Sequence, residues 1–461
     1  MSNYLFRLKQ KAKIPMEYIS IDEKLQIPII LEADVVVVGA GPGGLGAALF
    51  SARNGAKTVL VERYGVPGGM AVIAEVTPFM CSYYQNKVLD YPVYGQWRKA
   101  MNKYFPNDIS NYRNENIESY AGRGIHKEAA ALAAEDLLLE ANVEILYHHQ
   151  VTNVVKEGNK IVAIRCHYKG QEVAIKGKCF VDCSGDGELA SLAGCNFTLG
   201  NEKGQCQPMT LCFKLSHVDT NWNGNKDDAR IFELRKLLNE RYSQAVARGE
   251  IVCPRENVLL FPFELCDDNV VHFNTTRVVG ANPLDGMSFS QAEIEGRRQL
   301  RDIYFWLKKE IPEFANARLM SMGVQIGVRE SRHIEGINKI TIDNFRNKSK
   351  FDDAIARCAY AIDIHSPTGS GTVIEAIGKD NYYEIPYGCV VAKDVDNLTI
   401  GGRPISADAA IHSSFRIMPT AISIGQAAGL AASMSALNDI SPKDIDGKLV
   451  RSKLVEMGAF L

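Results

Sequence analysis

The stretch Asp34-Val-Val-Val-Val-Gly-Ala-Gly-Pro-Gly-Gly44 decides how the fold begins. Its four valines predict a short buried strand, and residues 45–54 follow it with the pattern of a helix. Gly39 permits a tight turn, Gly41 lets the main chain approach a pyrophosphate, and Gly44 lets the helix pack closely on the strand. The helix N-terminus adds free N–H groups and partial positive charge. We therefore expect a βα unit that binds the two phosphates of a dinucleotide.

A second strand and a terminal acid complete this unit. Residues 58–61 read Thr-Val-Leu-Val, and Glu62 follows them, 23 residues beyond Gly39. A carboxylate at the end of this strand accepts hydrogen bonds from both ribose hydroxyls and repels a 2′-phosphate. The motif alone does not choose between NAD and FAD.

The composition is that of an ordinary globular protein. The 461 residues are 46% hydrophobic and 23% charged, which suggests two or three folded units and excludes disorder, collagen and a small disulfide scaffold. Lys and Arg total 52 and Asp and Glu total 54, so the net charge of −2 gives no general attraction to nucleic acid or to acidic membranes. We expect neither as a partner.

The 11 cysteines are scattered, and no two of them are spaced as Cys-x-x-Cys. This pattern argues against zinc, a redox dithiol and a secreted disulfide framework, so we expect no metal site and reduced thiols in the cytoplasm. Basic residues over 7–13 are not followed by an apolar segment, so we expect no signal peptide. Cys81 has no cysteine nearby in sequence and is interpreted as a buried thiol.

Residues 420–437 are apolar enough to suggest a membrane span. However, Pro419 stands where a helix starts, and Gln426 interrupts the apolar run. Gly425 and Gly429 belong to a face of small residues that suits close packing inside a protein. We therefore predict a buried helix.

Three segments indicate a flavin. The loop Arg63-Tyr-Gly-Val-Pro-Gly-Gly-Met70 resembles the phosphate-side loop that many flavoproteins place after the ribose acid. Residues 180–194 resemble the second flavin-contacting turn of glutathione-reductase-like flavoproteins. In that class the helix opened here by Arg416-Ile-Met-Pro-Thr420 points its N-terminus at the flavin edge that becomes negative on reduction.

Further motifs resemble successive signatures of a bacterial family of FAD-dependent oxidoreductases, distantly related to the fumarate reductase flavoprotein and to tRNA-modifying flavoproteins. These motifs are Ser184–Ala190, Gln207–Thr210, Gly327–Arg332, Asp363–Pro367, Ile385–Tyr387, Gly402-Arg403 and Gly425–Gly429. The resemblance runs from about residue 30 to residue 437. It implies FAD as the cofactor and an α/β fold, in which a Rossmann-like FAD-binding domain of the glutathione-reductase type carries an inserted α+β substrate domain.

The resemblance also implies which residues hold FAD. The predicted contacts are Gly39, Gly41, Pro42, Gly44, Glu62, Arg63, Gly69, Met70, Val151, Ser184, Gly185, Asp186, Gly402, Arg403, Met418, Pro419 and Thr420. Among them, Val151 lies where this class packs against the adenine. Covalent attachment of the flavin stays open.

The predicted FAD-binding domain is discontinuous. It is assembled from residues 28–105, 118–210 and 385–461, and the insertion occupies residues 211–384. A second Gly-x-Gly-x-x-Gly unit between a strand and a helix is absent from the sequence, so we expect FAD to be the single stably bound dinucleotide.

Within the insertion, the hydrophobic pattern predicts helices and strands that roof the flavin. The expected elements are a helix over 229–248, strands over 257–264 and 270–279, and a helix over 291–310. Ser290 and Glu293 make a capping box for the last of these helices.

Four residues are candidates for chemistry beside the flavin. His365 lies in a loop and histidine titrates near neutrality, so His365 is the candidate general acid or base, with a surface or structural histidine as the alternative. Arg329 could clamp carboxylate or hydroxyl oxygens, or form a structural pair with Glu330. His412 precedes the flavin-edge segment and is expected to touch the ring or the substrate. Arg416 could support the charge of the reduced flavin or cap the following turn.

These features favour an FAD-dependent oxidoreductase that transfers a hydride between a small polar metabolite and flavin N5. The electron acceptor or donor is unidentified, and a homo-oligomer is open. An aromatic hydroxylase is suggested by Asp186-Gly187, but Gly401-Gly-Arg403 stands where such enzymes place a Gly-Asp motif. Two further functions stay open: a tRNA-modifying flavoprotein, which calls for a basic face, and an electron-transfer subunit docked to an iron–sulfur or quinone partner.

Overall fold

The computed structural model describes residues 25–80, 82–85, 87–104, 125–219, 228–262 and 269–461. Two features singled out in the sequence, Cys81 and the basic residues over 7–13, lie outside the described residues. The nine described cysteines are buried and free. No disulfide therefore joins any two of them.

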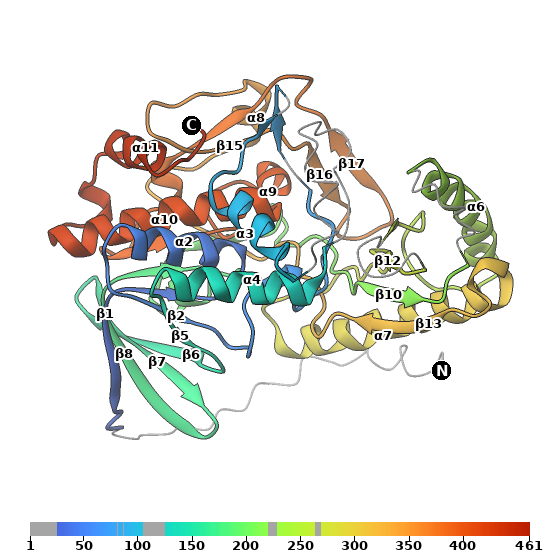
Figure 1. Ribbon diagram of the computed structural model, residues 1–461, viewed down its shortest axis with the longest axis horizontal. Helices are drawn as coiled ribbons and strands as arrows, with labels where there is room; N and C mark the ends of the chain where they lie inside the picture. The colour runs from blue at the N-terminus through green and yellow to red at the C-terminus, as the bar shows by residue number, and fades with distance from the viewer. Residues whose placement is uncertain (1–24, 81, 86, 105–124, 220–227, 263–268) are drawn as a thin grey trace.

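A seven-stranded sheet forms the centre of the larger lobe, on the left of Figure 1. Its order is β5, β2, β1, β8, β7 and β6, with β19 paired to the end of β8. Strands β5, β2, β1, β8 and β19 are parallel, whereas β7 and β6 continue antiparallel. The bounds are β1 Ile29–Val38, β2 Thr58–Val61, β5 Glu144–Leu146, β6 Gln150–Glu157, β7 Lys160–Tyr168, β8 Gln171–Asp182 and β19 Leu398–Ile400.

Helices and short strand pairs surround this sheet. The helices are α2 Pro42–Arg53, α3 Val93–Met101, α4 Lys127–Glu140, α5 Glu188–Leu192, α8 Ile342–Arg346, α9 Ala409–Phe415, α10 Met418–Asn438 and α11 Gly447–Glu456. The strand pairs are β3 Tyr83–Tyr84 with β4 Lys87–Val88, β9 Phe197–Leu199 with β14 Arg332–Ile334, β15 Ala354–Cys358 with β18 Tyr383–Pro386, and β16 Ile362–His365 with β17 Thr372–Glu375. Most of their buried apolar side chains join one large hydrophobic core.

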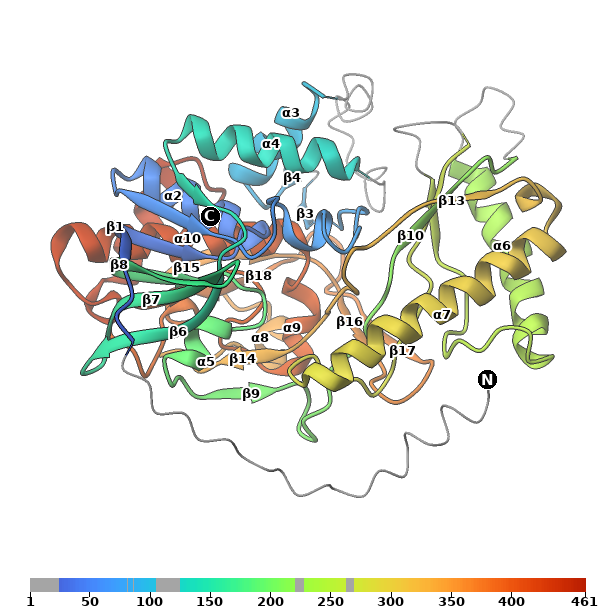
Figure 2. The same ribbon diagram turned by 90° about the horizontal axis from the view of Figure 1, so that it is seen from below.

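A second, antiparallel sheet forms the smaller lobe, on the right of Figure 2. Its order is β11 Leu260–Pro262, β12 Val271–Phe273, β10 Phe213–Ser216 and β13 Arg318–Met322. Helices α6 Asp228–Ala247 and α7 Gly286–Glu310 pack on it, and their apolar side chains complete a second core.

The second core covers less of the chain than the predicted insertion. Its buried residues lie between Met209 and Val328. The buried apolar residues between Ile334 and Tyr383 pack into the large core instead. This segment therefore packs with the predicted FAD-binding domain, although the insertion was expected to run over 211–384. The domain boundaries stay a prediction.

A buried carboxylate joins the two lobes. Glu75 is fully buried in the connection that follows β2, and it pairs with Lys127 of α4. Its carboxylate also accepts a hydrogen bond from Ser321 Oγ of β13 at 2.9 Å and lies 3.8 Å from Lys214 Nζ of β10. Because breaking a buried ion pair leaves an uncompensated charge, this cluster fixes how the second sheet sits against the first.

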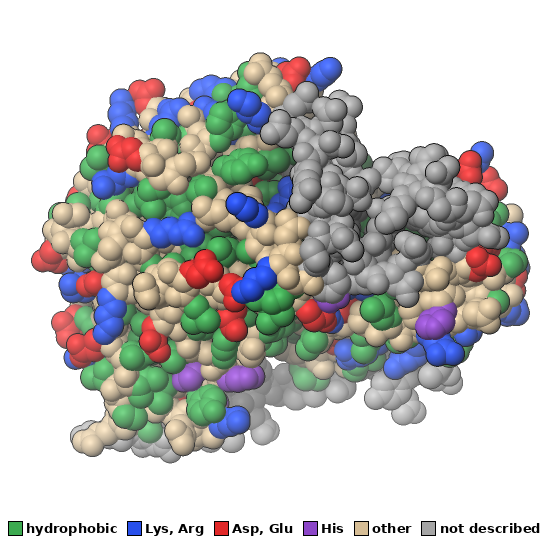
Figure 3. Space-filling model, in the orientation of Figure 1, with side chains coloured by type: hydrophobic (Ala, Val, Ile, Leu, Met, Phe, Trp, Pro, Cys, Tyr) green, Lys and Arg blue, Asp and Glu red, His purple; other side chains and the backbone are tan. Residues whose placement is uncertain are grey.

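Charges of both signs are mixed over the face shown in Figure 3. The exposed ion pairs include Lys448–Asp352 at 3.0 Å and Arg346–Glu375 at 3.0 Å. Pairs of this kind add little stability because water screens them. The described surface on this face therefore carries no extended field of one sign.

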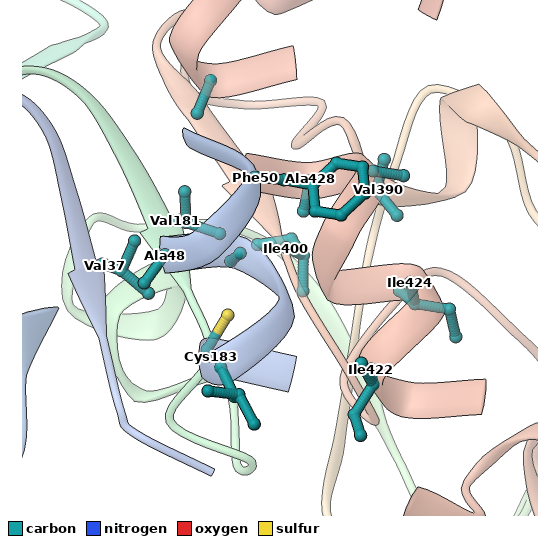
Figure 4. Packing of buried hydrophobic residues seen from close by; sticks show 14 of the residues in the cluster. Val37, Ala48, Phe50, Val181, Cys183, Val390, Ile400, Ile422, Ile424 and Ala428 are labelled. Atoms are coloured by element: carbon teal, nitrogen blue, oxygen red, sulfur yellow. The ribbon is translucent and has the colours of Figure 1, made fainter. Parts of the chain in front are cut away.

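The packing of α2 against α10 ties the C-terminal part of the chain to the N-terminal βα unit. A Cβ atom on Gly425 would overlap the Gly43 carbonyl oxygen, and one on Gly429 would overlap the Ala47 carbonyl oxygen. The two helices thus touch backbone to backbone, and apolar side chains of α2, β8 and α10 gather beside this contact (Figure 4). Although α10 is long and apolar enough to cross a membrane, 94% of its most apolar window is buried in the protein. The predicted buried helix is confirmed.

Three details of the predicted insertion are wrong: the start of one helix, its capping box and the lengths of two strands. Helix α7 begins at Gly286, not at residue 291, and its N-cap is Asp285, whose carboxylate accepts from Ser288 N at 2.6 Å. Glu293 forms no capping box because its carboxylate accepts from Ile326 N at 2.7 Å. The described parts of the strands predicted over 257–264 and 270–279 are also shorter, with three residues each in β11 and β12.

The contact between α2 and α10 makes a first prediction. Gly429→Ala is expected to lower the free energy of unfolding by about 1–3 kcal/mol, because the added methyl group overlaps rigid backbone. The measurement is urea unfolding followed by circular dichroism. Gly286→Ala, where the new methyl group meets open space at the start of α7, is the control and should change the value by no more than about 0.5 kcal/mol. Equal stability of both variants would contradict the tight contact.

Candidate active site

Four parallel strands of the main sheet end in one row. Val38 of β1 pairs with Val61 of β2 and with Asp182 of β8, and Ile400 of β19 pairs with the same Asp182. The residues that follow these four strand ends, Gly39, Glu62, Cys183 and Gly401, all line one groove. The carboxyl edge of a parallel sheet is where α/β folds bind their ligands.

Glycine is favoured at positions 39, 41 and 44 of the first turn for three different physical reasons. Gly39 has φ +97°, and a Cβ atom there would overlap the Cys183 carbonyl. A Cβ atom on Gly44 would overlap the Gly39 carbonyl oxygen, so Gly44 serves the close packing of α2 on β1. A Cβ atom on Gly41 would meet only Gly69 Cα, at an ordinary 3.7 Å, and Gly41 lines the groove. The protein itself therefore has room for a side chain at Gly41. A ligand that lies on this backbone would leave no such room.

Glu62 is fixed at the end of β2 by backbone donors. Its carboxylate accepts from Ala40 N at 2.7 Å and from Tyr64 N at 2.9 Å. Burial raises the pKa of the Glu62 carboxyl, and these two hydrogen bonds oppose the shift. The side chain is 6% exposed and lines the groove, so its remaining lone pairs are placed for ribose hydroxyls.

The turn after β8 is held by the buried Asp182. Its carboxylate accepts from Ser184 N at 3.0 Å, from Ser184 Oγ at 2.6 Å and from Ala190 N at 2.8 Å. The following Asp186 accepts from Ser331 Oγ at 2.7 Å and lies 3.3 Å from Arg403 Nη2. This network orders the turn, whose Ser184, Gly185 and Asp186 line the groove.

The N-terminus of α10 reaches the same groove. The helix begins at Met418 after Ile417, which supplies no side-chain cap, and Met418 and Ala421 line the groove. Its first N–H groups and its partial positive charge are therefore free to act on an anionic edge of a ligand.

Most of the predicted cofactor contacts come together in this groove. The exceptions are Gly44, Pro419 and Thr420, which are buried in the packing around it and do not line it. Lining residues that the sequence reasoning missed include Tyr64, His149, Gln325 and Gly401. Gly401 follows a strand end, so its position in the row was a usable signal, whereas nothing in the sequence marked Gln325, which comes from the other lobe.

A second cavity of about 480 Å³ adjoins the groove; we call it the adjoining cavity. Met70, Arg403, Arg416 and Met418 line both spaces, so the groove and the cavity share a wall. The far side is lined by residues of the smaller lobe, such as Arg255 and Asn274. Three of the four predicted catalytic residues, Arg329, His365 and Arg416, line this cavity.

His365 is held in one tautomer. Arg277 Nη2 can only donate, and it lies 2.7 Å from His365 Nδ1, so this nitrogen accepts and Nε2 carries the proton. Nε2 faces Asp363 Oδ2 at 3.4 Å. Burial and the Arg329 guanidinium lower the pKa of His365 to about 3. The premise that His365 titrates near neutrality is therefore wrong in this environment.

Asp363 is the anionic partner of this cluster. Burial alone would raise the pKa of its carboxyl, but His365 and Arg416 hold it well below its usual value. Arg416 Nη2 lies 3.6 Å from the carboxylate and donates to the Asp363 carbonyl at 3.1 Å. Arg416 is thereby fixed at the wall between the groove and the adjoining cavity.

Arg329 is not the partner of Glu330. Its Nη1 donates to the Pro208 carbonyl and to Thr210 Oγ1, each at 2.6 Å. Glu330 instead accepts from Gln207 N at 2.9 Å and lies 3.2 Å from His333 Nε2. The structural pair considered in the sequence is wrong, and Arg329 faces the adjoining cavity as a cation with neutral partners.

His412 lies away from both spaces. It is 1% exposed, packs edge-on against His333 at 4.5 Å between ring centroids, and lies 4.0 Å from Glu330. It lines neither the groove nor the cavity. We expected His412 to touch the ring or the substrate because it precedes the flavin-edge segment. However, α9 turns this side chain into the core, so His412 does not face either space.

The groove fits FAD by its chemistry. Gly41 and the start of α2 suit a pyrophosphate, Glu62 suits the ribose, and the start of α10 suits a ring edge that gains negative charge. The family model described as FAD dependent oxidoreductase matches residues 34–454. The chain belongs to this family. FAD is accordingly its cofactor.

Matches of this FAD dependent oxidoreductase to curated proteins are partial. It is 28% identical over 173 residues to a digeranylgeranylglycerophospholipid reductase of Picrophilus torridus. This match covers 35% of this chain and 41% of that protein. It is 55% identical over 40 residues to a thiamine thiazole synthase of Methanococcus maripaludis, which covers 9% of this chain and 15% of that protein. The matches thus span less than half of the length of these relatives.

Solved structures are similar at low sequence identity. A geranylgeranyl bacteriochlorophyll reductase-like protein of Thermoplasma acidophilum aligns with a TM-score of 0.44 and 13% identity, over 93% of this chain and 84% of that one. The p-nitrophenol 4-monooxygenase of Pseudomonas putida aligns with a TM-score of 0.46 and 11% identity, over 93% and 87%. The mixed α/β fold with a parallel-sheet FAD-binding domain is established, whereas the glutathione-reductase type stays a prediction.

The role of Gly41 makes a second prediction. Gly41→Ala is expected to weaken FAD binding at least about tenfold, because the methyl group occupies the space where the pyrophosphate approaches the backbone. The measurement is quenching of FAD fluorescence on titration with apoprotein. Urea unfolding of the apoprotein should stay within about 0.5 kcal/mol of wild type. Unchanged affinity would show that the diphosphate lies elsewhere.

The setting of His365 makes a third prediction. The unfolded histidine takes up a proton near pH 6.5 and the folded one only near pH 3, so the unfolded state binds more protons between these values and stability falls as the pH falls. His365→Gln is expected to remove about 2 kcal/mol of the wild-type loss between pH 7 and pH 5. Urea unfolding at both pH values measures it. His167→Gln, at an exposed position, is the control, and an identical pH dependence in both variants would refute the assignment.

Proposed function

We propose that this FAD dependent oxidoreductase transfers a hydride between a small polar metabolite and flavin N5. The observation that carries the proposal is the wall shared by Met70, Arg403, Arg416 and Met418, which puts a cavity lined by several charged side chains directly beside the cofactor groove. A metabolite in the adjoining cavity would meet the flavin across this wall. When bound, FAD supplies the hydride chemistry itself.

The residues around the wall bind, orient and stabilise charge. Arg416, fixed by Asp363, and the N-terminus of α10 both bring positive charge to this wall, where reduction makes the ring anionic. The one N–H of His365 faces Asp363 and its other ring nitrogen accepts from Arg277, so in this proposal His365 positions Asp363 and does not act as a base. Arg277 keeps that tautomer in place.

The electron acceptor or donor is proposed to be a separate partner that meets the reduced flavin in turn. The sequence holds one Gly-x-Gly-x-x-Gly unit, at residues 39–44, and the groove beside it accounts for FAD. The mixed charges on the face in Figure 3 favour a metabolite enzyme over an RNA-modifying one.

Anaerobic absorbance of the purified yellow protein tests the proposal. One or more small metabolites from a panel should bleach the flavin band in the absence of NADH and NADPH. Retention of the colour with every metabolite, together with rapid bleaching by NADH or NADPH alone, would contradict it. Bleaching that occurs only with a co-purified iron–sulfur protein or a quinone would favour an electron-transfer subunit instead.

A further inference from the structure

The adjoining cavity has a large excess of positive charge. Its lining contains Arg255, Arg277, Arg329, Arg403 and Arg416. The carboxylates in the lining are Asp363 and Glu256. Because His365 is neutral, cationic side chains exceed anionic ones by three in this lining. Such an excess of positive charge around a cavity attracts an anion.

Two of the five arginines are neutralised by protein carboxylates. Arg403 lies 3.3 Å from Asp186, and Arg416 lies 3.6 Å from Asp363. Both also belong to the wall shared with the cofactor groove. These two arginines are therefore positioned at the flavin side of the cavity, each with a carboxylate partner.

The other three arginines have no carboxylate within 4.0 Å among the residues that the structure describes. Arg277 donates hydrogen bonds to the carbonyls of residues 369–371, to His365 and to Thr372. It therefore holds this loop at the edge of the adjoining cavity. Arg329 donates through Nη1 to two neutral oxygens. Arg255 makes one long hydrogen bond, from Nε to Asn257 Oδ1 at 3.4 Å, and its buried Nη1 has no partner among the described residues.

These guanidinium groups also lower one another's pKa. Burial lowers the pKa of Arg329 to about 9, and the neighbouring Arg416 and Arg255 add to this shift. Burial and then Arg277 lower the pKa of Arg255. Like charges this close in a buried place cost free energy unless an anion lies between them. Among the described residues neither Arg255 nor Arg329 has a carboxylate within 4.0 Å, so an anionic ligand would supply the compensating charge that these two side chains lack.

We propose that the adjoining cavity binds a small dicarboxylate, with Arg255 and Arg329 each binding one of its carboxylates. This inference rests on the proposed function and names the substrate class of that site. Arg255 lies on the segment before β11 in the smaller lobe, whereas Arg329 lies beside the Thr210–Gly327 bridge, so the two guanidinium groups come from separate elements. Separate cations suit two carboxylates on one carbon chain, and each fork matches a carboxylate in two hydrogen bonds.

Isothermal titration calorimetry of the FAD-loaded enzyme tests the inference without turnover. The ligands are succinate and glutarate, with butyrate, succinamide and inorganic phosphate for comparison. At least one dicarboxylate should bind about tenfold or more tightly than butyrate and succinamide, because these lack one or both charges. Equal binding of butyrate or succinamide would overturn the inference, as would tighter binding of inorganic phosphate than of either dicarboxylate, or no heat from either dicarboxylate at millimolar concentration.

Substitutions locate the binding groups. Arg255→Gln is expected to weaken dicarboxylate binding at least about tenfold, and Arg255→Lys to weaken it less, because lysine keeps the charge and loses the fork. Arg248→Gln, on the exposed surface beyond α6, is the matched control and should bind as wild type does. The flavin absorbance of each variant reports whether it still folds. Wild-type affinity in a yellow Arg255→Gln protein would overturn the assignment.

The two proposals fail in different ways. If a dicarboxylate binds in the calorimeter but no metabolite bleaches the flavin, the hydride-transfer function fails and the ligand class stands. If an uncharged metabolite bleaches the flavin and dicarboxylates do not bind, the ligand class fails alone.

Discussion

The site depends on the parallel pairing of four strands that end in one row. Val38, Val61, Asp182 and Ile400 are in register across the sheet, although they come from three distant parts of the chain. Each strand end is followed by a residue of the cofactor groove. These strand ends are buried on both faces, so a shift of one residue in any of these pairings would exchange the side chains that pack on the two faces and move its groove residue away. Register, set by the buried apolar strands, is therefore what places the cofactor contacts.

The helix pair α2 and α10 brings a second helix N-terminus to this row of strand ends. The backbones of the two helices touch at Gly425 and Gly429, and α10 begins at the wall between the groove and the adjoining cavity. In the placement that we propose, α2 would contact one end of FAD and α10 the other. The buried cluster around Glu75 then holds the smaller lobe over this end, so that Arg255 can reach a cavity that opens on the larger lobe.

The sequence predicts local units better than it predicts contacts between distant segments. The strand, turn and helix around Gly39 and the small-residue helix after Pro419 were predictable, because each is encoded by neighbouring residues. His412 was misplaced because its position beside the flavin-edge segment does not reveal that α9 turns it inward. The tautomer of His365 depends on Arg277 and its lowered pKa depends on burial and Arg329, both of them remote in sequence, and the five arginines of the cavity meet only in the fold.

The most direct test of the central claim is a crystal structure of the protein with its flavin bound. We expect the diphosphate to lie on the backbone at Gly41 and the isoalloxazine ring to lie at the wall formed by Met70, Arg403, Arg416 and Met418, with N5 open to the adjoining cavity. A ring that lies elsewhere, or a wall that seals the cavity from N5, would contradict this placement.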